Sequence, residues 1–107
     1  MDLRIEEASG GRTVVAPVGD LDLESAPQLR VELLGLMDEG RVDIELDLRD
    51  VDFLDSAALG VLVAARHRAD ELGGHLVLGN AGPHLVKLFH VSGMDRVFAL
   101  ADSGPGR

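Results

Sequence analysis

The segment RVDIELDLR alternates charged and apolar residues without a break from Arg41 to Arg49. Successive side chains of a β-strand point to opposite faces, so this pattern predicts a strand with two different faces. One face carries Val42, Ile44, Leu46 and Leu48, and the other carries Asp43, Glu45 and Asp47. Such a strand fits a sheet that is covered by other elements on one side only.

Three other segments have apolar residues at three- and four-residue steps, which is the spacing of a helix. We expect these helices to begin at Ser25, Ser56 and Pro83 and to end at Gly40, Gly73 and Gly93. The side chains expected to face the core are Ala26, Leu29, Leu33, Leu36 and Met37 in the first helix and Leu85, Leu88 and Phe89 in the third.

Further strands are predicted around these helices. LRIEEA (residues 3–8) and RTVVAPVGD (residues 12–20) are expected to pair antiparallel through a turn at Ser9–Gly11, and Pro17 places the second of them near a sheet edge because it has no N–H to donate. HLVLGN (residues 75–80) and RVFAL (residues 96–100) are the remaining strands. This order predicts an α/β fold with a mixed, largely parallel sheet of about four to five strands and helices mainly on one face.

The chain has 107 residues, which fits a single domain. We expect residues 3–101 to be structured and residues 102–107 to form a flexible tail. The first residues lack the apolar stretch of a signal peptide, and the longest apolar run, Ala57–Ala65, is shorter than the roughly 20 residues that span a bilayer. We therefore expect a cytoplasmic protein that does not insert into membranes.

The charge balance narrows the choice of partner. Ten Lys and Arg against 19 Asp and Glu give a formal net charge of −9, which disfavours nucleic acid and favours a partner with a basic patch. The sequence contains no cysteine, so disulfides, thiolate metal sites and cysteine nucleophiles are excluded.

Ser56 follows Asp55 directly and precedes the apolar start of the second helix. In one interpretation, Ser56 or Asp55 only caps this helix and contributes about 1 kcal/mol. In the other, Ser56 accepts a phosphate, which the free amides and the dipole of a helix N-terminus would stabilise. The GDLD segment, Gly19–Asp22, also joins a strand to a helix and is expected at the same rim of the sheet. A phosphate would then add about −1.5 to −2 charge beside Asp20, Asp22, Asp52 and Asp55.

Three stretches resemble the STAS domain family and, within it, the single-domain anti-sigma factor antagonists of bacteria. VGDLDLESAPQL is similar to the family's G-[DE]-L-D segment and its following helix, and DLRDVDFLDSAALGVLVAAR to its D-L-x-x-V-x-F-x-D-S-S-G-L-G-x-L block. HVSGMDRVF is similar to its C-terminal S-G-L-x-x-x-F. The resemblance runs from about Val14 to Phe98.

The resemblance implies a switch rather than an enzyme. In this family an anti-sigma factor that is also a serine kinase phosphorylates the serine that corresponds to Ser56, and a serine phosphatase resets it. The unphosphorylated antagonist binds the anti-sigma factor and frees the sigma factor, and the phosphorylated one releases it. The implied partner surface consists of Asp20, Leu21, Asp22, Asp55, Ser56, Ala57, Ala58, Leu59 and Gly60. No cofactor or metal is implied.

The sequence departs from the family pattern at Ala57, which replaces a second serine, and at Ala58, which replaces a glycine. Ser56 is therefore the only candidate acceptor in the motif. Alanine favours a helix over glycine by about 1 kcal/mol, and its methyl group occupies space that a partner backbone would approach. A different choice of partner and a scaffold role without phosphorylation both stay open.

Other functions fit these residues less well. Catalysis by Ser56 as a nucleophile is disfavoured because no G-x-S-x-G elbow is present and the four histidines are scattered. A metal site at GDLD or DVDFLD is disfavoured because neither segment has calcium-loop spacing. A STAS subunit of a lipid-transport ATPase is the remaining alternative, and neighbouring genes would discriminate it from the switch.

Overall fold

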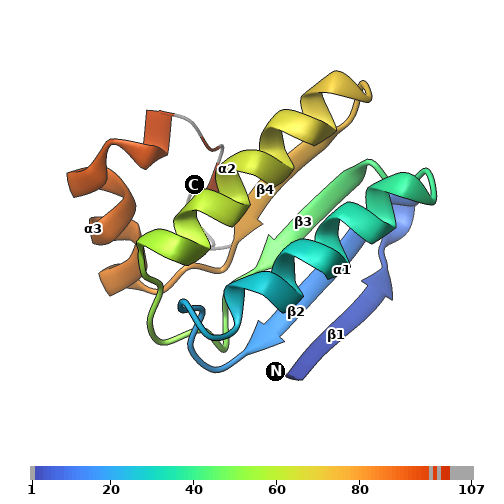
Figure 1. The fold of residues 1–107 in the computed structure, drawn as a ribbon. Helices are drawn as coiled ribbons and strands as arrows, with labels where there is room; N and C mark the ends of the chain where they lie inside the picture. Colours follow the sequence, from blue (N-terminus) through green and yellow to red (C-terminus); the bar gives the residue numbers. More distant parts are fainter. Residues whose placement is uncertain (1, 97, 99, 102–107) are drawn as a thin grey trace.

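Strand β3 (Asp43–Asp47) lies at the centre of a five-stranded sheet with the order β1-β2-β3-β4-β5 (Figure 1). The structure is a computed structural model that describes residues 2–96, 98 and 100–101. Strand β1 (Asp2–Glu7) pairs antiparallel with β2 (Thr13–Val18). Strands β2, β3, β4 (His75–Gly79) and β5 (Leu100–Ala101) run parallel. The predicted mixed, largely parallel sheet is confirmed.

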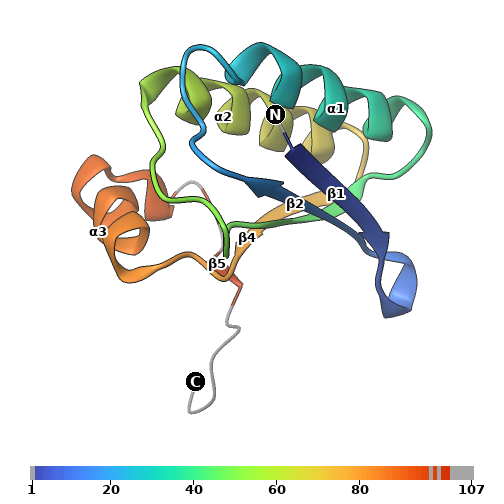
Figure 2. The same ribbon diagram turned by 90° about the horizontal axis from the view of Figure 1, so that it is seen from below.

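Helices α1 (Ala26–Asp38) and α2 (Ser56–Glu71) lie side by side over one face of the sheet, and α3 (Pro83–Ser92) lies beside them (Figure 2). Two short 3-10 turns, η1 (Ser9–Gly11) and η2 (Met94–Arg96), complete the described elements. The core lies between the sheet and α1 and α2, where Ile44, Leu46 and Leu48 of the β3 segment are fully buried. All five residues predicted to face the core from α1 are buried there.

Among the residues that the structure describes, no helix lies over the opposite face of the sheet (Figures 1 and 2). The acidic side of β3 is half-buried, and Arg12 lies against it. Arg12 Nε is 3.6 Å from Asp43 Oδ1, and Arg12 Nη1 is 3.5 Å from Glu45 Oε1. The two-faced strand predicted from the alternation is therefore present, with its acidic side partly neutralised by one arginine.

β2 lies between β1 and β3, one strand in from the sheet edge, in agreement with the position near an edge that Pro17 predicted. Pro17 lies beyond the ladder with β3, which pairs only with Thr13–Val15. One detail of the predicted sheet needs correction. The last strand covers only Leu100–Ala101, while Arg96 belongs to η2; Val97 and Ala99 lie outside the described residues. The expected tail, residues 102–107, also lies outside them.

Candidate functional site

Two loops meet at the carboxyl ends of β2 and β3, as the GDLD segment predicted (Figure 1). We call residues 19–25 the first loop and residues 48–55 the second loop. The amide of Gly19 donates to the carbonyl of Asp50 at 2.9 Å, and the amide of Leu21 donates to that of Phe53 at 2.9 Å. The amide of Asp55 in turn donates to the carbonyl of Leu21 at 3.0 Å. Leu21 and Leu54 form a parallel bridge, so the loops extend the sheet by one step.

Asp55 caps α2 and joins the two loops. Its backbone is extended, and its carboxylate accepts a hydrogen bond from the Ala58 amide at 3.1 Å through Oδ1. The other oxygen, Oδ2, accepts one from the Leu23 amide of the first loop at 2.9 Å. Of the two capping candidates in the sequence, the aspartate performs this role.

Ser56 is the first residue of α2 and is exposed. Among the residues that the structure describes, no hydrogen bond involves its hydroxyl. The first amides of a helix lack partners within the helix and carry the positive end of its dipole. The Ser56 hydroxyl is therefore free to react at a place that favours an added anion.

The first loop holds its own aspartate through a compact set of bonds. Asp22 Oδ1 accepts hydrogen bonds from the amides of Glu24 and Ser25, both at 3.1 Å. Ser25 Oγ donates to the Asp20 carbonyl at 3.0 Å and accepts from the Asp22 amide at 3.0 Å. Asp22 and Asp55 thereby line one shallow depression of about 380 Å³ together with Leu23 and Glu24.

The predicted partner surface divides into exposed and buried parts. Asp20, Ser56 and Gly60 are exposed, and Asp22, Asp55, Ala57 and Leu59 are half-buried. Leu21 and Ala58 have 0% exposure, so their side chains cannot contact a partner, and this part of the prediction is wrong. Both face the core because Leu21 pairs with buried Leu54 and Ala58 lies on the inner side of α2.

Sequence reasoning missed two exposed apolar residues on the same loops. Leu23 is 75% exposed and Phe53 is 52% exposed. No pattern in the sequence marked either residue. Alternation would place Phe53 on the same side as the buried Val51, and the first loop turns at Leu23.

One further contact joins α3 to these loops. His84 donates through Nε2 to the Asp52 carbonyl at 2.6 Å, so it ties the start of α3 to the second loop.

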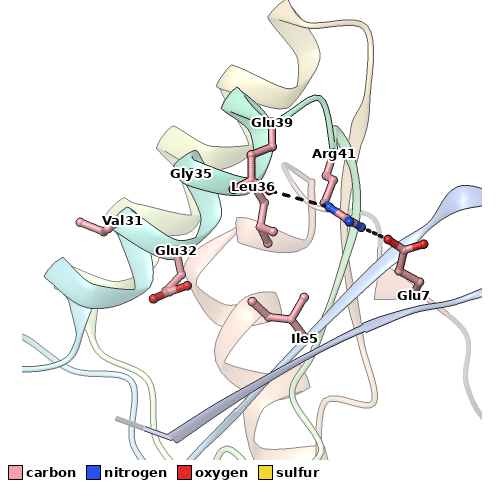
Figure 3. Close-up of a pocket in the computed structure, with 8 residues that line it drawn as sticks. All are labelled: Ile5, Glu7, Val31, Glu32, Gly35, Leu36, Glu39 and Arg41. Carbon is pink, nitrogen blue, oxygen red and sulfur yellow. Dashed lines mark hydrogen bonds and ion pairs between the residues drawn. The ribbon is translucent and has the colours of Figure 1, made fainter.

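Within the described part of the chain, no group of three or more His, Asp or Glu side chains is arranged to hold a metal, and no helix there is long and apolar enough to span a membrane. A groove of about 400 Å³ between β1 and α1 is lined by Ile5 and Val31 and by the ion pair of Arg41 and Glu7 (Figure 3).

Comparisons with known proteins agree with this architecture. The profile of the family described as "Mlab, STAS domain" matches residues 6–101, so the chain belongs to the STAS domain family. The anti-sigma-B factor antagonist of Bacillus subtilis (strain 168) is 34% identical over 88 residues, which are 82% of this chain and 80% of that protein.

Solved structures give the same result. An anti-sigma factor antagonist from Mycobacterium paratuberculosis has a TM-score of 0.83 at 25% identity and covers 95% of this chain and 86% of its own. The anti-sigma factor antagonist SpoIIAA has a TM-score of 0.68 in its unphosphorylated form, at 20% identity and coverages of 90% and 97%. The phosphorylated form, from Bacillus, has a TM-score of 0.72 at 21% identity, with coverages of 95% and 93%; these two similarities concern the fold.

Proposed function

We propose that this chain is an anti-sigma factor antagonist whose binding is switched by phosphorylation of Ser56. Unphosphorylated, it binds an anti-sigma factor with serine kinase activity and thereby frees a sigma factor. Phosphorylated, it releases the anti-sigma factor until a serine phosphatase removes the phosphate. The chain acts as the substrate of the kinase and needs no cofactor of its own.

The observation that carries this proposal is the division of labour at the start of α2. Asp55 supplies the cap, while the exposed Ser56 hydroxyl takes part in none of the described hydrogen bonds. A phosphate added there breaks no described bond, so the fold is expected to survive modification. The names of the relatives, and the phosphorylated state in which SpoIIAA was solved, support the same switch.

Electrostatics supply the reason for release. A kinase that phosphorylates Ser56 must hold the phosphates of its nucleotide against this hydroxyl. After transfer, Ser56 carries a group of about −1.5 to −2 charge that faces the phosphates remaining on the nucleotide. Asp52 and Asp55 lie near Ser56 in the sequence, and Asp20 and Asp22 lie on the first loop. Like charges placed opposite each other at an interface cost several kcal/mol, so the complex dissociates.

The test is binding of the purified chain to each serine-kinase anti-sigma factor that the source bacterium encodes, by isothermal titration calorimetry. Ser56→Asp is expected to weaken binding by at least about tenfold, because it imitates part of the phosphate charge. Ser56→Ala is expected to bind like the wild type.

Ser9→Asp is the matched control for net charge. Ser9 is exposed in η1, at the opposite end of β2 from the two loops, so this variant adds the same charge far from the partner surface. Binding by Ser56→Asp as tight as by Ser9→Asp would contradict the switch. If no anti-sigma factor binds the wild type, the proposed function fails, and co-purification with transport ATPase subunits would favour the alternative.

A further inference from the structure

The two paired loops expose their large apolar side chains beside Asp55. Leu23 is 75% exposed, and its amide donates to Asp55 Oδ2. Phe53 is 52% exposed, lies two residues before Asp55, and its carbonyl accepts a hydrogen bond from Leu21. The backbone at both positions is therefore fixed, although the side chains extend into solvent.

A fixed and exposed apolar side chain is well suited to binding. Little conformational freedom of the backbone remains to be lost when a partner covers it, and large apolar side chains in central pockets dominate the affinity of protein interfaces. Two other apolar residues are strongly exposed, Val31 on α1 at 68% and Val91 on α3 at 74%. They lie on separate helices away from the loops. Single exposed residues of that kind are common on protein surfaces.

The loops around this pair are predominantly acidic. The first loop, residues 50–55 of the second loop and the start of α2 contain no lysine or arginine, while Arg49 stands near the beginning of the second loop and Arg4 of β1 lies 3.8 Å from Asp50. The two loops carry five acidic residues near the pair, which we call the acidic ring: Asp20, Asp22, Glu24, Asp52 and Asp55. This ring repels a second copy of the chain, nucleic acid and an anionic lipid surface, and it attracts a basic protein surface.

We propose that Leu23 and Phe53, which we call the anchor pair, hold the anti-sigma factor by entering an apolar pocket that is bordered by lysine and arginine. The acidic ring accelerates association, and the anchor pair slows dissociation. This inference rests on the proposed function and adds to it the residues that determine affinity, which are separate from the residue that switches it.

The experiment measures association and dissociation rates by surface plasmon resonance. The chain is tested against each purified serine-kinase anti-sigma factor of the source bacterium. The variants are Leu23→Ala and Phe53→Ala, with Val31→Ala and Val91→Ala as controls of similar exposure and Ser56→Asp as a monitor of the switch. Circular dichroism checks that each variant is folded. If Phe53→Ala fails to fold, Leu23→Ala still tests the proposal, because Leu23 is three-quarters exposed and its truncation should not affect folding.

Each anchor variant is expected to weaken binding by about tenfold or more, mainly through faster dissociation, with the salt dependence of association unchanged. Both controls are expected to stay within about twofold of the wild type. Anchor variants within twofold, alongside a weakened Ser56→Asp, would overturn the anchor pair and leave the proposed function standing. No binding by the wild type would overturn both.

A lipid test separates the remaining possibility. The chain is sedimented with vesicles of phosphatidylglycerol and phosphatidylcholine, and no binding is expected because of the acidic ring. Vesicle binding that disappears in Leu23→Ala would assign the pair to a membrane surface and overturn the inference.

Discussion

Ser25 and Ser56 both stand where a loop after a strand enters a helix, yet the structure uses them in opposite ways. The Ser25 hydroxyl donates to the Asp20 carbonyl and accepts a hydrogen bond from the Asp22 amide. The Ser56 hydroxyl is exposed and has no hydrogen bond among the described residues. One serine stabilises a loop, and the other is left available for chemistry.

The position of the neighbouring aspartate explains this difference. Asp22 lies three residues before Ser25, so each side chain accepts a hydrogen bond from the other residue's amide within one tight turn. Asp55 lies directly before Ser56, occupies the cap position itself and bonds to the Ala58 amide. Ser56 is thereby shifted to the first helical position, where no cap is required of it. An Asp-Ser pair at a helix start can thus separate stability from reactivity.

The largest expected difference between the two serines concerns phosphate itself. In protein purified from the native host, intact mass and peptide mapping should find phosphate on Ser56 in the wild type and in Ser25→Ala. The Ser56→Ala variant should carry none, because the free hydroxyl at the start of α2 is gone. Phosphate that persists in Ser56→Ala would place the acceptor elsewhere.

Removing the shared carboxylate should have the largest effect on stability. Asp55→Ala deletes the cap on Ala58 and the bond to Leu23 of the first loop. We expect a loss of about 2 kcal/mol in the free energy of unfolding, from a helix cap and one bond to a charged acceptor. Urea denaturation measures it, and Asp52→Ala, an exposed carboxylate, should stay within about 0.5 kcal/mol of the wild type. Equal losses for the two variants would mean that Asp55 does not join the loops.

Replacing the two serines should change the free energy of unfolding by smaller and different amounts. Ser25→Ala should lower the free energy of unfolding by about 1 kcal/mol, since its hydroxyl bonds are lost. Ser56→Ala should change it by less than about 0.5 kcal/mol, as for an exposed substitution. Urea denaturation measures both changes in the free energy of unfolding. A larger loss for Ser56→Ala than for Ser25→Ala would show that Ser56 caps the helix in solution.

The sequence predicted the parts of the fold that periodicity encodes. The alternation around Ile44 and the helical spacing from Leu29 to Met37 identified the buried faces, because burial repeats with the period of each element. Pattern could not rank Asp55 against Ser56 as the cap, since both residue types suit that position. Only the local backbone, extended at Asp55, decides between them.

The exposure of the loop residues was predicted less well for a related reason. The family resemblance assigns positions along the chain, but it does not state which side of the backbone faces solvent. The predicted partner surface therefore included Leu21 and Ala58 although both are fully buried. It left out Leu23 and Phe53 although both are exposed. The bridge between Leu21 and Leu54 fixes this orientation, and it joins residues too far apart in the sequence for periodicity to relate them.

The smallest effect should come from the contact that ties α3 to the second loop. His84→Ala removes the donor to the Asp52 carbonyl, and we expect a loss of about 0.5 kcal/mol because the bond is exposed. Hydrogen exchange should accelerate at the amides of Val51 and Asp55, which donate hydrogen bonds in the second loop, while Ala58 and the rest of α2 stay protected, since Asp55 still caps that helix. His67→Ala, an exposed histidine in α2, is the control and should leave exchange in the second loop unchanged. Faster exchange along α2 in His84→Ala would mean that the loop and the cap open together, and that the two helix starts are less independent than their hydrogen bonds indicate.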